Sequence, residues 1–180
     1  MPPLKRLLGL GRSTEQPEAL YAALLAQARQ PAFYQGGVPD TLEGRFDLIL
    51  LHLLLLLRRL REDALTQALA QDVFDFFFRE MDRALREMGV GDLSVPRRVH
   101  DMAEAFYGRA RAYDAALEAE GDEALEAALD RNVFAGTGDR EAPARLARYV
   151  RAAVETLAAV PREDFLAGRL RFPDPTPFRP

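Results

Sequence analysis

Apolar residues recur every three or four positions along most of this chain, which is the spacing of one face of an α-helix. No segment shows the strict alternation of a half-buried β-strand. Six stretches carry the helical spacing: residues 17–28, 40–60, 64–88, 95–117, 122–134 and 143–157, with a short further turn over 162–166. The pattern therefore predicts an all-α protein, a single-domain bundle of about six antiparallel helices.

The second predicted helix is apolar on almost every side. Between Leu48 and Leu57 the only polar residue is His52. Arg45, His52 and Arg59 recur every seven residues, so they form one narrow polar stripe. The apolar run is shorter than the roughly 20 residues that a membrane-spanning helix needs. We therefore expect a central, buried helix around which the others pack.

Turn-forming residues separate the predicted helices. A loop is predicted over 31–39, which contains two prolines and two glycines. Asp40, followed three residues later by Glu43, is typical of a capping box at the start of the central helix. Gly89 is placed to end the third helix in a left-handed conformation.

These elements divide the chain into three parts. Residues 1–16 are expected to be a flexible segment, 17–171 a helical domain, and 172–180 a proline-rich tail that is extended or disordered. The first part combines Lys5, Arg6 and several leucines, which makes it a candidate for peripheral contact with a membrane. A frayed terminus is the favoured alternative there.

Composition narrows the possible functions. The chain has 180 residues with 48% apolar and 29% charged residues, which is typical of a folded globular protein. Its formal net charge of −4 argues against a nucleic-acid partner. The absence of cysteine excludes disulfides, thiolate metal sites and cysteine nucleophiles. With no secretory signal pattern, we expect a cytoplasmic location.

The sequence offers no catalytic constellation, so we expect no enzyme, no cofactor and no metal. A di-iron bundle needs a glutamate three positions before a histidine. Ile49 and Arg97 occupy that position before His52 and His100. The carboxylates alternate with arginines on polar helix faces, where solvent exposure is the ordinary explanation.

Surplus aromatic residues are the remaining candidate for function. Phe74 and Phe78 extend the apolar face of the third predicted helix sideways. In the simpler alternative another helix covers them. In the other they form a partly exposed groove that accepts an apolar partner helix.

Several stretches have residue patterns that general helix and turn rules do not demand. The Arg-Glu-Met-Gly-Val-Gly-Asp block at 86–92 is the most specific of them; the others lie within 21–46, 81–96, 106–113 and 131–134. Together they resemble the ubiquinol–cytochrome c chaperone family over roughly residues 20–157.

The resemblance implies a non-catalytic function in assembly of the cytochrome bc1 complex. Its client is then newly made cytochrome b or another subunit of that complex, met at the inner face of a bacterial inner membrane. Mitochondrial members carry a targeting extension and use a small partner protein. This sequence shows no such extension, which resembles a bacterial member and leaves the co-chaperone open.

A chaperone for membrane helices needs apolar surface with a polar rim. The hypothetical contact is formed by Phe74, Phe78 and Tyr107, and its rim by Arg45, Arg86, Asp92 and Arg109. The alternative for each charged residue is a local structural bond, such as Arg86 with Asp82. A rival function of another class is a helical-bundle carrier with a closed cavity for a quinone or lipid.

Overall fold

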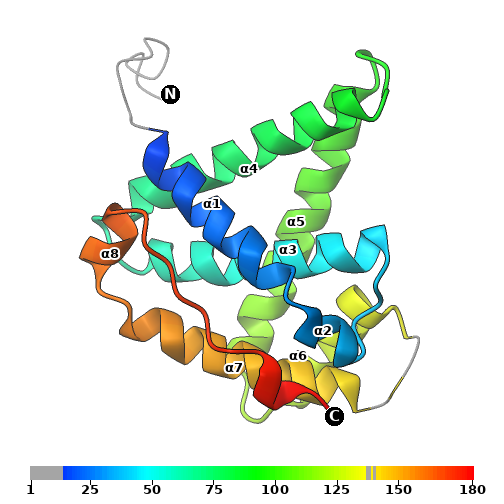
Figure 1. The fold of residues 1–180 in the computed structure, drawn as a ribbon, viewed down its shortest axis with the longest axis vertical. Coiled ribbons are helices and arrows are strands. Elements are labelled where there is room, and N and C mark those ends of the chain that lie inside the picture. Colours follow the sequence, from blue (N-terminus) through cyan, green and yellow to red (C-terminus); the bar gives the residue numbers. More distant parts are fainter. Residues whose placement is uncertain (1–13, 137–138, 140) are drawn as a thin grey trace.

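A computed structural model describes residues 14–136, 139 and 141–180, and within these ranges it contains helices and no strand. The all-α prediction is confirmed, and Figure 1 shows the arrangement. The α-helices are α1 (Glu15–Ala28), α2 (Pro31–Gln35), α3 (Leu42–Arg61), α4 (Gln67–Glu87), α5 (Val95–Glu118), α6 (Glu123–Leu129), α7 (Ala142–Ala159) and α8 (Arg162–Leu166). A π-helical turn (Asp130–Phe134) follows α6, and a 3-10 turn (Thr176–Phe178) lies near the C-terminus. Residues 1–13, which include the basic leucine-rich motif considered as a candidate for membrane contact, lie outside the described residues.

Helix α3 is the centre of the fold. It runs across the middle of the molecule, with α1 and α4 on one side and α7 on the other (Figure 1). Every side chain from residue 50 to residue 57 is buried. Burying one leucine contributes about 1.5–3 kcal/mol, so this helix supplies a large share of the hydrophobic stabilisation. The predicted central apolar helix is therefore present.

Two details at the start of α3 differ from the prediction. Thr41, and not Asp40, caps the helix, since its hydroxyl accepts a hydrogen bond from the Gly44 amide at 3.1 Å. The Asp40 carboxylate instead accepts from Arg45 at 2.6 Å. The predicted loop over 31–39 contains the short helix α2, because Pro31 at its first turn has the backbone angle that a helix start needs.

Helix α4 begins later than predicted and ends as predicted. Thr66 donates to the Leu60 carbonyl at 2.7 Å, which holds a turn just before the helix. At the other end, Gly89 has φ of +80° and its amide bonds the Arg86 carbonyl, while the Val90 amide bonds the Leu85 carbonyl. This pair of bonds is the Schellman motif, so the predicted left-handed cap is confirmed.

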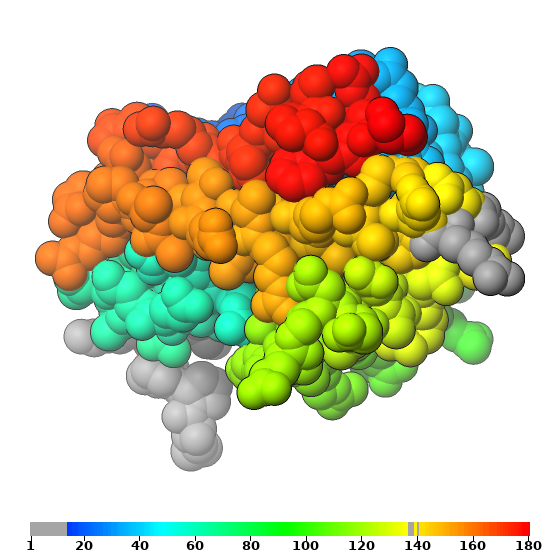
Figure 2. Space-filling view, turned by 90° about the horizontal axis from the view of Figure 1, so that it is seen from below, coloured from blue at the N-terminus to red at the C-terminus, as the bar shows by residue number. Residues whose placement is uncertain are grey.

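The proline-rich tail packs against the helices. After Gly168 the chain turns back and runs along α1 and α7 (Figures 1 and 2). The Pro173 carbonyl accepts from Gln27 at 2.9 Å, and the rings of Phe172 and Phe178 contact His52 and Tyr149. The first part of the tail is therefore extended, as one of the two predicted alternatives, and the tail ends in the 3-10 turn that closes over the core.

Candidate functional site

Four aromatic side chains of α4 and α5 form one cluster, here called the aromatic flank: Phe74, Phe78, Phe106 and Tyr107. The rings of Phe74 and Phe78 are 4.6 Å apart, and that of Tyr107 lies 6.0 Å from Phe74. The structure thus brings together all three aromatic residues proposed from the sequence. These offset and tilted arrangements are the ones that aromatic pairs favour.

Phe106 is the member that the site prediction missed. Its ring lies 5.3 Å from Phe74 and 6.0 Å from Phe78, and the side chain is buried. It is therefore the floor on which the other two rest. The available signal was its place on the apolar face of α5, directly before Tyr107, but spacing alone does not say which helix that face meets.

The flank is neither covered nor fully open. Phe74 and Phe78 are half-buried, while Tyr107 is 52% exposed. Helix α5 covers one side of the two α4 rings and leaves their other side accessible. The exposure of these rings therefore lies between the two alternatives drawn from the sequence.

A hollow of about 180 Å³ lies beside the flank. Its floor is apolar, formed by Leu57, Ala70, Phe74 and Phe106. The exposed side chains of Arg61, Gln67, Gln71 and Tyr107 surround it, so it opens at the surface. It is smaller than a usual ligand pocket of about 300–1,000 Å³ and is not the closed cavity that a carrier requires.

The charged residues proposed as a rim lie in three separate places. Arg45 bonds Asp40 and lies over the Tyr34 ring, 5.3 Å from its centroid, at the start of α3. At the far end of α4, Arg86 bonds Asp82 at 2.7 Å and Asp92 at 2.5 Å. The local alternative for Arg86 is therefore present in the structure.

Arg109 occupies the third place, where it joins α5 to α3. Its guanidinium donates to the Asp47 carboxylate at 2.9 Å, and both side chains are largely buried. Burial raises the pKa of Asp47, although the nearby Arg109 charge opposes that shift. The Arg109 Nε has no hydrogen-bond partner among the described residues. This ion pair fixes α5 relative to the central helix.

A second polar–aromatic group, here called the His52 network, lies inside the protein. His52 Nδ1 is 2.7 Å from the Leu48 carbonyl, an acceptor, so this nitrogen carries the proton. The Tyr149 hydroxyl then donates to Nε2 at 2.8 Å, and Gln27 donates to the same hydroxyl at 3.0 Å. Burial lowers the pKa of His52 from 6.5 to about 4, so the ring is neutral near pH 7. The network is fully bonded and closed, which suits a structural group.

The part of the chain that the structure describes offers no metal site and no membrane-spanning helix. No group of three or more histidine, aspartate or glutamate side chains there is arranged to hold a metal ion. Among the helices of the described ranges, none has the length and apolar character to cross a bilayer. The half-open aromatic flank is thus the best candidate for function.

Comparison with known proteins identifies the family of this chain. The profile of the Ubiquinol-cytochrome C chaperone family matches residues 35–172. The crystal structure of the Cbp3 homolog from Brucella abortus is similar, with 39% identity, a TM-score of 0.80, and coverage of 89% of this chain and 90% of that one. A comparison with curated protein sequences finds no match. The family match covers well over half of the residues, and the chain belongs to the ubiquinol–cytochrome c chaperone family.

Proposed function

We propose that this protein is a non-catalytic assembly chaperone of the cytochrome bc1 complex that binds newly made cytochrome b through the aromatic flank. Family membership supports the general activity. The observation that carries the site is the half-open cluster of Phe74, Phe78 and Tyr107 beside a hollow with an apolar floor.

The chemistry of the client fits this surface. A membrane protein that is not yet assembled exposes apolar helix faces, and an apolar helix face binds in a groove through side chains spaced three or four residues apart. Aromatic side chains provide large contact area with few rotatable bonds. The polar side chains around the hollow, Arg61, Gln67 and Gln71, can bond the polar ends of such a helix. They also keep the unoccupied surface soluble.

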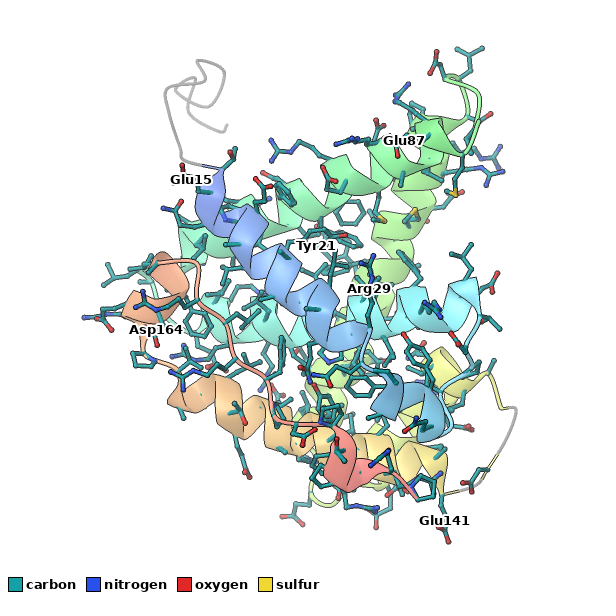
Figure 3. The ribbon with its side chains drawn as sticks, in the orientation of Figure 1. Glu15, Tyr21, Arg29, Glu87, Glu141 and Asp164 are labelled. Atoms are coloured by element: carbon teal, nitrogen blue, oxygen red, sulfur yellow. The ribbon has the colours of Figure 1, made fainter. Side chains whose placement is uncertain are left out.

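The test compares two phenylalanines of the same helix. Phe74 lies in the flank, whereas Phe76 faces α1, because its ring is 5.5 Å from that of Tyr21. Tyr21 is labelled on α1 in Figure 3. Both side chains are half-buried, so their replacement by alanine has similar costs for folding. Tagged F74A and F76A are expressed in a respiring bacterial host, solubilised gently, and analysed for co-purifying cytochrome b.

We expect F74A to lower the affinity for cytochrome b, and with it the co-purified amount, by roughly 30-fold, because removal of a central aromatic contact costs about 2 kcal/mol of binding. F76A is expected to retain it. Equal recovery with the two variants would remove the flank as the client site. Absence of cytochrome b even with the unaltered protein would contradict the proposed client.

A further inference from the structure

The turn between α4 and α5 carries apolar side chains that nothing in the described structure covers. It lies at a corner of the molecule, away from α7, α8 and the C-terminus, just beyond Glu87 (Figures 1 and 3). Leu93 is 98% exposed and Met88 is 64% exposed, while Val90 between them is half-buried. We call Met88, Val90 and Leu93 the apolar tip.

The backbone holds this tip in a defined shape. On the α4 side the Schellman bonds at Gly89 and Val90 close the helix. On the α5 side the amides of Ser94 and Val95 both bond the Gly91 carbonyl, at 2.7 and 3.2 Å. Beneath the turn, Leu85 and Val95 are buried. The turn itself therefore exposes Leu93 and Met88. Burying such a side chain would stabilise the fold by about 1.5–3 kcal/mol, and the exposed residues lack part of that stabilisation.

The charges around the tip leave an excess of free arginine. Arg86 forms ion pairs with both Asp82 and Asp92, and Arg83 forms one with Glu87 at 2.9 Å. Arg97 and Arg98, in the first turn of α5, are exposed and form no ion pair with any residue that the structure describes. The segment 82–98 thus has four arginines and three carboxylates in a chain whose formal net charge is −4.

We propose that the apolar tip inserts into the surface of a lipid bilayer that contains anionic headgroups. Met88 and Leu93 enter the boundary between headgroups and acyl chains, while Arg97 and Arg98 meet the phosphates. A helix rises 1.5 Å per residue, so the two arginines lie about one turn behind the tip, which matches an insertion depth of about 5–10 Å.

Shape favours a bilayer over a protein at this place. A projecting turn with isolated apolar side chains enters a soft, deformable interface without needing a matching cavity. The aromatic flank is the opposite case, because its half-buried rings border a hollow that a helix can fill. Each arginine near an anionic surface adds about 1 kcal/mol of attraction, which complements the small apolar area of the tip.

The chain contains no tryptophan, so a single one can report on the tip. The full protein carrying Leu93→Trp is mixed with vesicles of phosphatidylcholine alone or with added phosphatidylglycerol. Leu42→Trp is the matched control, because Leu42 is 73% exposed at the start of α3. Quenching by lipids brominated on their acyl chains measures depth. We expect a blue shift and quenching for Leu93→Trp with the anionic vesicles, and no change for Leu42→Trp.

Flotation of the untagged protein tests the chemistry of the contact. The double variants M88S/L93S and R97Q/R98Q are each expected to bind anionic vesicles at least roughly 10-fold more weakly than the unaltered protein. Both alter exposed side chains only, so thermal unfolding serves to check that they fold. Vesicle binding that persists in M88S/L93S would overturn the proposal. So would a loss of cytochrome b from the pull-down without a loss of vesicle binding, which would make the tip a protein contact.

Discussion

The aromatic flank and the His52 network use similar side chains in opposite ways. The network joins five segments that are far apart in the sequence: Gln27 comes from α1, His52 from α3 and Tyr149 from α7. The rings of Phe33, from α2, and Phe172, from the tail, pack against His52. The polar atoms of the network are bonded, and the rings of Phe33, His52 and Tyr149 are buried, with Phe172 half-buried at the outer edge. The flank comes from two consecutive helices, and its rings remain half-open. The His52 network connects distant parts of the chain and so stabilises the fold. The aromatic flank is a local cluster whose accessible rings can contact a partner.

The largest expected difference between the two regions is the cost of removing one aromatic side chain. Tyr149→Ala leaves a cavity and deprives both His52 and Gln27 of a partner, so we expect a loss of about 5 kcal/mol in the free energy of unfolding. Phe74→Ala removes a half-buried ring and should cost about 2 kcal/mol. Urea unfolding of both variants measures this. Equal losses of unfolding free energy in the two variants would show that the flank stabilises the fold as much as the His52 network does.

The pH dependence of stability gives the next largest effect. The pKa of His52 is about 4 in the folded protein and near 6.5 when the side chain is exposed. Between these values the unfolded chain binds a proton that the folded protein does not. The free energy of unfolding should therefore fall by about 3 kcal/mol as the pH drops from 6.5 to 4, with no further contribution from this group below pH 4.

The contribution of His52 is isolated by comparing the protein with His52→Gln, which lacks the titrating ring. Urea unfolding across this pH range should give a shallower slope for the variant. Parallel curves would show that other groups produce the dependence and that His52 has no role in it.

Gln27 links the network to the tail, and its removal should have an intermediate effect. Gln27→Ala loses bonds to Tyr149 and to the Pro173 carbonyl, so we expect a cost of about 2 kcal/mol. Hydrogen exchange at residues 172–178 should also become faster, because the tail loses an anchor. Gln71→Ala, at the exposed rim of the hollow, serves as the control and should change neither quantity.

The smallest effect is expected at the outer edge of the flank. Tyr107→Ala should change the free energy of unfolding by no more than about 0.5 kcal/mol, because half of the side chain already contacts water. Thermal unfolding measures this change. A loss above 2 kcal/mol would show that the flank is a structural core like the His52 network, and it would weaken the proposed client site.

Helical periodicity predicted most of the fold because it depends on near neighbours in the sequence. Helix α3 and the Gly89 cap follow from such local rules. Helix α2 was missed, since a five-residue helix is too short to show a period. The packing of the tail could not be predicted, because proline-rich composition fits both an extended and a disordered chain, and the anchoring bond from Gln27 spans 146 residues.

In the candidate site, too, contacts between near neighbours could be predicted from the sequence and contacts between distant residues could not. Phe74 and Phe78 are four residues apart on one helix, so their adjacency could be predicted. The position of Arg109 could not, because its partner Asp47 is 62 residues away on another helix. Phe106 was missed for a related reason, as only the packing of α5 on α4 shows that its ring supports the other two.

The path of the tail also orders events during synthesis of the protein. Helices α1 and α3 leave the ribosome early, but the segment that anchors to Gln27 and contacts His52 and Tyr149 is made much later. Until this segment has emerged, the contacts of Phe172 with His52 and of Phe178 with Tyr149 cannot form. The nascent chain therefore completes its own core only after translation has passed this segment.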